Sequence, residues 1–359
     1  MGGHSRPAVG VALLGAALIL IAGLFDAEPL YVPGLALLAL TVLALVWVRA
    51  AAHGAAVSRT LAAPRVQEDE PLLVDIEVRS GAVAIPAGEV RDTLLARPAR
   101  LGLARRRTRV RIRARFARRG RRRLPPAAVL VSDPIGLAGA LVTADGPADE
   151  VLVLPRIEPV LAAPRGGGRG TAGQRLAAAG AEVDLDGLRA HRPGVPASRI
   201  AWPVYARTGE LHERRLTAGG DARPLVVLDL SGTAVEADGD AAVRAAASLT
   251  VHLAQRGGCA LLLPGERRPV LVDPGLRGWA ALHARLALVP LGGRPAPVAL
   301  TGRAGPVLWV AARTLREPPR ALAHAGGGGR VLIVPGTLPG RAALLTVAGC
   351  TGYDLGARA

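Results

Sequence analysis

The stretch Pro224-Leu-Val-Val-Leu-Asp-Leu-Ser-Gly-Thr233 is a continuous apolar run that leads directly into a carboxylate, two hydroxyls and a glycine. An uninterrupted run of this kind is typical of a strand that is buried on both faces of a sheet. Open α/β sheets place their ligand sites where such strands end. We therefore predict that Pro224–Leu230 is the first strand of an α/β domain and that Asp229–Thr233 forms a loop at its carboxyl end.

The residues after this strand alternate between helical and strand patterns. We expect helices at Asp240–Gln255 and Trp279–Leu288 and strands at Cys259–Leu263, Pro306–Ala311 and Val331–Val334, with Ala321–Ala323 continuing the alternation. Strands that alternate with helices favour a parallel sheet with helices on both faces.

Asp229, Ser231 and Thr233 place oxygen atoms at alternate positions, which suits Mg²⁺ held together with several waters. The pattern resembles the metal-ion-dependent adhesion site of von Willebrand factor A domains, whose first motif is Asp-x-Ser-x-Ser. A complete site of that type also needs a later Thr and an Asp. The strand that ends at Ala311 continues instead into Ala312 and Arg313. We therefore favour a turn capped by the two hydroxyls over a metal site, and Mg²⁺ at a degenerate site is the only cofactor considered.

The segment Gly180–Arg215, just upstream, gathers arginines around Trp202 and Tyr205 in a chain that is only 3% aromatic. Guanidinium groups beside acids suit bidentate ion pairs, and a Trp face accepts a stacked Arg. A structural connector between domains is favoured over a site for an acidic partner or a phosphate, because structural ion-pair networks have the same composition. If Trp202 is buried in such a connector, truncating it would cost about 3–5 kcal/mol.

This segment resembles the signature of the domain of unknown function 58 family. The matching residues are Gly180, Glu182, Leu188, Arg189, Pro193, Gly194, Arg199, Ile200, Trp202, Ala206 and Arg207. Two positions depart from the family pattern, since His191 replaces a Tyr and Val195 replaces an Asp. The resemblance implies a binding or structural signature made by Glu182, Arg189, Gly194, Arg199, Trp202 and Arg207.

Two upstream motifs support the same resemblance. Arg119-Gly120 matches an Arg-Gly pair of the family, and Asp133-Pro-Ile-Gly-Leu137 stands where the family has Asp-Pro-Phe-Gly-Leu. The resemblance implies a membrane-anchored accessory protein with a β domain and a degenerate von Willebrand factor A-like domain. Such proteins are often encoded beside a MoxR-type AAA ATPase, and sometimes beside a transglutaminase-like membrane protein. They are thought to act in complex assembly or as adaptors, and the family's biochemical activity is not established.

Two apolar runs, Ala8–Phe25 and Leu30–Val48, lie near the start of the chain. At 1.5 Å per residue each would extend roughly 27 Å, close to the thickness of a hydrocarbon core. We therefore expect a transmembrane hairpin. For the first run a cleaved signal peptide is the alternative, and it would have a shorter apolar region.

The charges that flank these runs predict their orientation. Arg6 precedes the first run and Arg49 follows the second, whereas the connection carries Asp26 and Glu28. Because positive residues stay inside, both termini and the soluble domains are expected to be cytoplasmic. The family resemblance implies that the membrane is the plasma membrane of a bacterium.

From Val57 to Pro164 the pattern consists of short alternating runs separated by Gly and Pro. The clearest strands are Leu72–Arg79, Thr108–Phe116, Ala127–Val131 and Val151–Leu154, which together predict a small β-sandwich. The expected organisation is thus two transmembrane helices over 1–50, a β-sandwich over 55–164, a Gly-rich linker over 165–179, and the signature with the α/β domain over 180–359.

The net charge is +17, and all 45 of the Lys and Arg residues are arginine. We attribute this absence of lysine to the codon bias of a GC-rich genome. Arg109, Arg111, Arg113 and Arg115 alternate with small or apolar residues and so define one strand face. Nucleic-acid binding would need stacking aromatics there, and only Phe116 is present. A solvated face near anionic headgroups is favoured, and nucleic acid is an unlikely partner.

The remaining chemistry-bearing residues show no catalytic pattern. The seven histidines are scattered, and Cys259 and Cys350 lie in apolar stretches that favour reduced, buried thiols. The main expectation is therefore a non-enzymatic, membrane-anchored interaction or adaptor protein. The alternatives are an anionic-lipid or nucleic-acid binder that uses the Arg-rich strand, and a metal-dependent hydrolase at Asp229.

Overall fold

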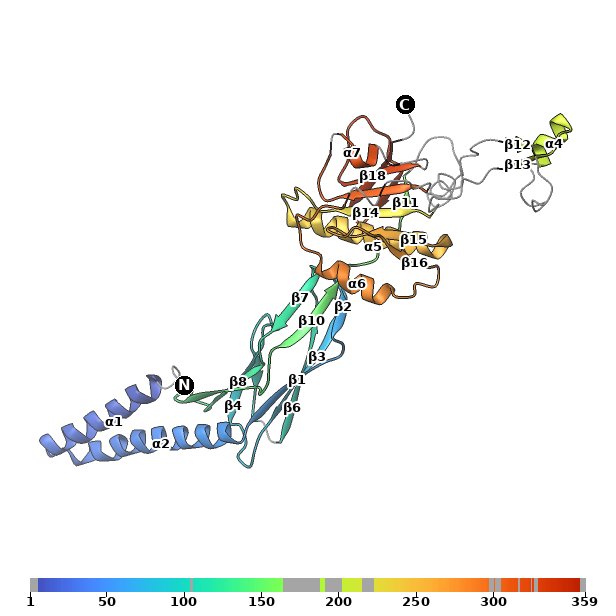
Figure 1. Cartoon of the computed structure of the whole chain (residues 1–359). Coiled ribbons are helices and arrows are strands. Elements are labelled where there is room, and N and C mark those ends of the chain that lie inside the picture. Colours follow the sequence, from blue (N-terminus) through green and yellow to red (C-terminus); the bar gives the residue numbers. More distant parts are fainter. Residues whose placement is uncertain are drawn as a thin grey trace. The chain divides into compact units, whose positions relative to one another are not determined.

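Figure 1 shows the computed structural model of the chain, which describes residues 6–103, 106–163, 188–190, 202–214, 223–296, 300, 305–315, 317–323, 325 and 329–355. The chain forms two units. The N-terminal unit comprises Met1–Ala117 and Arg121–Val153, and the C-terminal unit comprises Arg118–Gly120 and Leu154–Ala359. The linker predicted over 165–179 lies outside the described residues.

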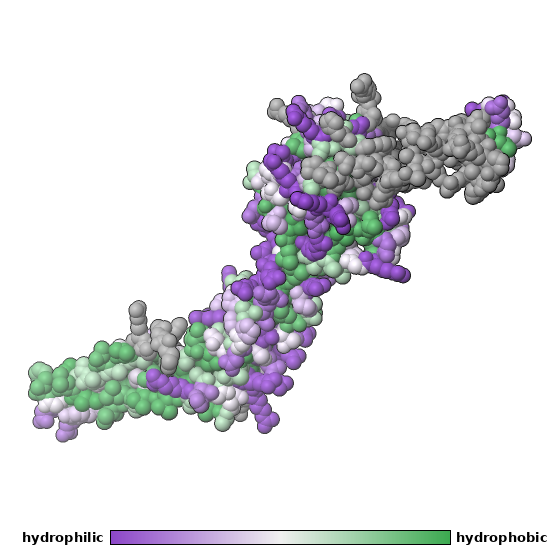
Figure 2. Space-filling model, in the orientation of Figure 1, coloured by the Kyte–Doolittle hydropathy of each residue, from purple (hydrophilic) through white to green (hydrophobic). Residues whose placement is uncertain are grey.

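Two long helices open the N-terminal unit. Helix α1 (Arg6–Leu24) is joined through the short 3-10 helix η1 (Glu28–Leu30) to α2 (Tyr31–His53). They pack closely because glycines face each other: a Cβ on Gly15 would lie 2.9 Å from the carbonyl oxygen of Gly34. Both helices are long and apolar enough to cross a membrane. Figure 2 shows their hydrophobic surface in green.

The C-terminal turns of α2 belong to the core of the N-terminal unit. Ala44, Val48 and Ala51 are buried in the same cluster as residues of the β-strands. The indole Nε1 of Trp47 donates a hydrogen bond to the Ala84 carbonyl at 3.4 Å. The hydropathy of the sequence did not distinguish this end of the helix from the rest.

The strands of the N-terminal unit form three small sheets. Their orders are β1-β3-β6, β5-β4-β8-β9 and β2-β10-β7. The bounds are β1 (Ala56–Leu61), β2 (Arg65–Gln67), β3 (Leu72–Arg79), β4 (Ala87–Arg91), β5 (Ala99–Leu101), β6 (Arg107–Ala114), β7 (Gly120–Leu124), β8 (Ala128–Ser132), β9 (Gly139–Thr143) and β10 (Asp149–Leu154). The strand-rich character predicted for this region is confirmed, and β3 has the predicted bounds.

The arginines of β6 are exposed, as its alternating pattern predicts, and Ile112 and Ala114 point into the core. Acidic residues of the neighbouring strand β3 pair with several of them: Asp75 pairs with Arg111, and Glu77 pairs with both Arg107 and Arg109. The hydrogen bond from Arg79, followed by the charges of these arginines, lowers the pKa of Glu77. The positive face is therefore partly neutralised by its own sheet.

The C-terminal unit is built on an eight-stranded sheet with the order β11-β19-β20-β18-β17-β14-β15-β16. Its four central strands are parallel: β14 (Leu225–Asp229), β15 (Cys259–Leu262), β17 (Val307–Ala311) and β18 (Arg330–Pro335). The flanking strands β11 (Leu161–Ala162), β16 (Val270–Val272), β19 (Leu345–Val347) and β20 (Cys350–Asp354) pair antiparallel. The prediction of a parallel sheet was therefore wrong at the edges, where short connections such as the one between β19 and β20 permit only antiparallel pairing.

Helices cover both faces of this sheet. Helices α5 (Glu236–Gly257) and α6 (Trp279–Leu288) pack on the face that carries Val226 and Leu308. The short helix α7 (Arg320–Ala323) contributes Leu322 to the opposite face, beside Trp309. A separate hairpin pairs β12 (Leu188–Ala190) with β13 (His212–Arg214), and α4 (Trp202–Thr208) precedes β13.

The two cysteines lie within this core and are not bonded to each other, which confirms the prediction of reduced, buried thiols. Burial raises the pKa of both Cys259 and Cys350 to about 12. Since the thiolate is the reactive form, neither side chain is expected to react in the folded protein at neutral pH.

Candidate functional site

The carboxyl end of β14 is the point where the strand order of the parallel sheet reverses. The second strand of the α/β domain, β15, lies on one side of β14, and the third, β17, lies on the other. In an open sheet, the connections then leave in opposite directions and a crevice forms at this edge. Asp229 is the last residue of β14, and its carbonyl accepts a hydrogen bond from Ala312 at 2.9 Å.

The side chains of Asp229 and Thr233 organise a tight turn at the end of the strand. The buried Asp229 carboxylate accepts a hydrogen bond from the Ser231 backbone N–H at 3.0 Å. Thr233 donates its hydroxyl to the Leu230 carbonyl at 2.6 Å. Within the part of the chain that the structure describes, Asp229 has no ion-pair partner. Of the predicted oxygen ligands, the Thr233 hydroxyl is thus committed to the backbone, whereas Asp229 and Ser231 lie together.

Arg313 lies at the same edge, just after β17. A Cβ on Gly232 would lie 2.8 Å from Nη1 of Arg313 and 3.1 Å from its Cζ, so the guanidinium packs against the Gly232 backbone. Gly232 also has a φ of 65°, which favours glycine. A metal site of the adhesion type would need a second carboxylate near this loop. The positively charged Arg313 lies there instead. The described residues contain no group of three His, Cys, Asp or Glu side chains that could hold a metal.

We expect Mg²⁺ not to bind at this loop below millimolar concentrations. One buried carboxylate neutralises a divalent cation incompletely, Arg313 adds repulsion, and Mg²⁺ loses its waters reluctantly. Isothermal titration of Mg²⁺ into the full-length protein tests this, with Asp229→Ala as the control. A micromolar dissociation constant that disappears in the control would contradict the prediction.

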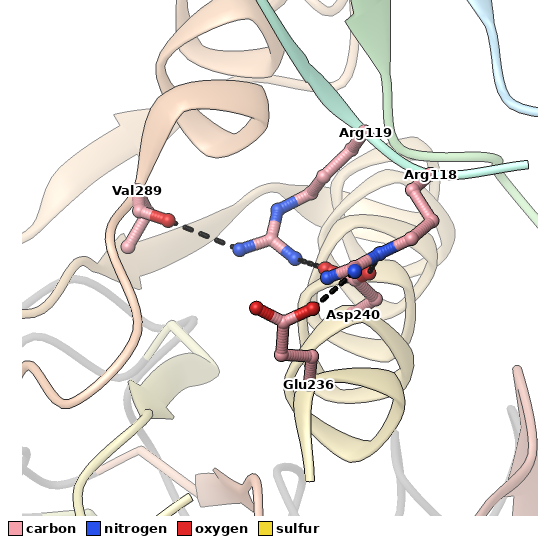
Figure 3. Close-up of polar contacts among 5 residues, drawn as sticks. All are labelled: Arg118, Arg119, Glu236, Asp240 and Val289. Atoms are coloured by element: carbon pink, nitrogen blue, oxygen red, sulfur yellow. Dashed lines mark hydrogen bonds and ion pairs between the residues drawn. The ribbon is translucent and has the colours of Figure 1, made fainter. Parts of the chain in front are cut away.

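Two arginines meet the start of α5 close to this loop (Figure 3). Arg118 donates from Nε to Asp240 at 2.8 Å and also pairs with Glu236, and Arg119 pairs with the other Asp240 oxygen. The hydrogen bond to Glu236, followed by that to Asp240, raises the pKa of Arg118. Arg119 and Asp240 are almost fully buried, with side-chain exposures of 5% and 7%. The pair is therefore a charged contact inside the C-terminal unit.

The segment after α6 completes this framework. Arg119 donates from Nη2 to the Val289 carbonyl at 3.0 Å. A few residues later, Gly292 donates its N–H to the Leu230 carbonyl at 2.9 Å, and Gly293 accepts from the Leu230 N–H at 3.0 Å. The end of β14, the start of α5 and this segment are thus held together by hydrogen bonds. The sequence pattern placed Arg119 in the Arg-Gly pair of the family resemblance and Asp240 at the start of a predicted helix, but it did not indicate that the two side chains pair.

The residues of the family signature are only partly described. Glu182, Gly194 and Arg199 lie outside the described residues, and Arg189 stands opposite Glu213 in the β12–β13 pairing. Trp202 and Arg207 lie on α4, where Trp202 is 54% exposed and meets Tyr205 edge to face at 6.2 Å. The burial that would make Trp202 a strong structural contact is therefore not observed.

We accordingly expect Trp202→Ala to change the unfolding free energy of the protein by less than about 1 kcal/mol, because an exposed side chain loses little packing. Urea unfolding of the full-length protein in detergent measures this, with Trp309→Ala as the buried-tryptophan control. A loss of several kcal/mol at Trp202 would show that the segment is a structural connector after all.

No protein-family model matches this chain, and no curated protein matches its sequence.

Proposed function

We propose that this protein is a membrane-anchored, non-enzymatic adaptor whose helices α1 and α2 span a bacterial plasma membrane. The observation that carries the proposal is the apolar surface of these helices. Large hydrophobic side chains are exposed along both, including Val9, Leu13, Leu14, Leu20, Leu24, Val32, Leu35, Val42, Leu43 and Val46. An apolar surface of this extent on a protein in water marks a membrane or protein interaction site. A bilayer suits it because each helix satisfies its own backbone hydrogen bonds.

The carboxyl edge of the sheet in the C-terminal unit is the surface that we assign to a partner protein. The β15-β14-β17-β18 order, with α5 directly after β14, supports a von Willebrand factor A-like domain that has a degenerate adhesion site at Asp229. The exposed side chain of Arg313, which lies against Gly232, gives this edge a polar group for a protein partner to contact. The resemblance to the domain of unknown function 58 family makes a MoxR-type AAA ATPase the partner to test first.

Membrane fractionation and copurification test the two halves of the proposal. The full-length protein should stay with membranes after an alkaline carbonate wash, and a co-expressed MoxR-type ATPase from the same genome should copurify with it. Substituting Arg313→Ala should weaken copurification without releasing the protein from membranes. Release by carbonate would refute the anchor, and equal copurification of the Arg313 variant would refute the assigned surface.

The orientation is tested by a reporter fused after Ala359. Because Arg6 and Arg49 flank an acidic connection, we expect a reporter that works in the cytoplasm to be active and one that works outside to be silent. The reverse result would place the soluble units on the other side of the membrane.

A further inference from the structure

The turn between β8 and β9 presents an unusually exposed isoleucine. Ile135 is 62% exposed, although it lies in a well-folded part of the N-terminal unit. A single exposed apolar side chain is common on protein surfaces, so its significance depends on the surface that lies next to it.

The turn is rigid, so the exposure of Ile135 does not result from a loose loop. The buried carboxylate of Asp133 accepts hydrogen bonds from the backbone N–H groups of Ile135 at 3.0 Å and Ala138 at 2.6 Å. The Gly136 N–H donates to the Asp133 carbonyl at 3.2 Å, and Gly136 has a φ of 77°. An aspartate that satisfies the backbone of its own turn in this way fixes the turn geometry. Ile135 is exposed, whereas Ala138 of the same turn is buried.

The hairpin lies beside α2. Both β8 and β9 contact this helix, and Ala138 shares a core cluster with Ala44 and Val48. On α2 itself, Leu43 and Val46 remain exposed next to these buried residues. The exposed apolar surface of the helix therefore continues at the level of the hairpin.

Two contacts place the turn at the same level as Trp47. The indole of Trp47 donates to the Ala84 carbonyl, just before β4, and Ala87 at the start of β4 pairs with Ser132 at the end of β8. The turn begins at the next residue. Tryptophan and arginine are typical of the boundary between hydrocarbon and water, and Trp47 is followed by Arg49. The turn thus stands where α2 would leave the bilayer.

We propose that the 133–138 turn is a third membrane contact, in which Ile135 inserts into the lipid interface beside α2. The partner is the bilayer itself, because β8 and β9 contact α2 and Ala138 of the turn packs in one cluster with Ala44 and Val48 of that helix. The inference rests on the proposed membrane anchor. The hydrogen bonds that the Asp133 carboxylate accepts satisfy two backbone N–H groups of the turn, which lowers the cost of entering the interface. The turn would reinforce the orientation that α2 already gives the N-terminal unit through its buried residues Ala44 and Val48.

Site-specific fluorescence in lipid tests this contact. The full-length protein carrying Ile135→Cys is labelled with an environment-sensitive fluorophore and reconstituted into phosphatidylcholine and phosphatidylglycerol vesicles that contain doxyl-labelled quencher lipids. The label reacts selectively with the introduced cysteine, because Cys259 and Cys350 are buried and burial raises the pKa of both thiols to about 12. Leu20→Cys on α1 reports the anchor. Leu73→Cys is the matched control. Gly81, just after the end of β3, lies against Gly54, the residue that follows α2. Leu73 lies at the opposite end of β3 and is therefore remote from α2.

We expect lipid quenching at positions 20 and 135 to be at least twice that at position 73. Quenching at position 20 with position 135 equal to position 73 would overturn the lipid contact and leave the anchor standing. A blue-shifted but unquenched label at position 135 would also overturn it, since a protein surface would then cover the turn. Absence of quenching at position 20 would refute the anchor itself.

Discussion

Substituting Asp240→Asn is expected to lower the unfolding free energy of the C-terminal unit by about 3–5 kcal/mol, because it removes one partner of a buried ion pair. The Asp240 carboxylate pairs with Arg118 and Arg119, and the Arg119 side chain is only 5% exposed. Asparagine keeps the shape but not the charge, so Arg119 would remain buried with its charge uncompensated. Hydrogen exchange at the amides of β14 and α5 measures the loss in this unit.

Glu236→Gln is the matched control for this substitution. Glu236 also pairs with Arg118, but its side chain is 66% exposed. Exposed pairs contribute about 0–1 kcal/mol, so the control should change protection little. Equal protection in wild type and Asp240→Asn would mean that Arg119 reaches water or another acceptor when its partner is lost.

The second large loss of stability is expected at Val48, near the end of helix α2, which is long and apolar enough to cross a membrane. Val48 is 2% exposed and belongs to the core cluster that includes Val129 and Val131 of β8, so Val48→Asn would bury an amide in an apolar core. A buried polar group without a partner costs about 1–3 kcal/mol on mutational scales, and lost packing adds to this. The N-terminal unit should therefore unfold at lower urea concentration in detergent.

Val46→Asn is the control, because Val46 lies two residues earlier on the same helix and is 59% exposed. The protein should keep its urea midpoint in detergent when only this outward position changes. If the two variants lose the same stability, the end of α2 is not part of the folded core.

Local pattern was enough for several elements. The alternation in Leu72–Arg79 predicts a strand with one buried face, and the apolar run before Asp229 predicts a strand buried on both faces, because side-chain direction repeats every second residue. Helix α6 also has its predicted bounds, Trp279–Leu288. The four antiparallel strands at the edges of the large sheet were not anticipated, since short strands carry little periodic signal.

Local sequence likewise predicted one part of the candidate site, and strand pairing decided the other. Its position at the end of β14 follows from local sequence, because a carboxylate, two hydroxyls and a glycine come directly after a buried strand. The approach of Arg313 to Gly232 could not be read from the sequence, since it depends on β17 lying next to β14. Pairing between strands that are distant in sequence is decided by how the whole sheet buries its two faces.

The chain's own sequence therefore determined which segments are apolar enough to cross a membrane, which are strands, and where the central strand ends. Tertiary structure alone decided that Asp240 meets Arg118 and Arg119, more than a hundred residues away, and that Val48 belongs to a protein core while Val46 remains exposed. The physical reason is that hydropathy and periodicity act within a few residues. Ion pairs and core packing form between side chains whose proximity exists only after the chain has folded.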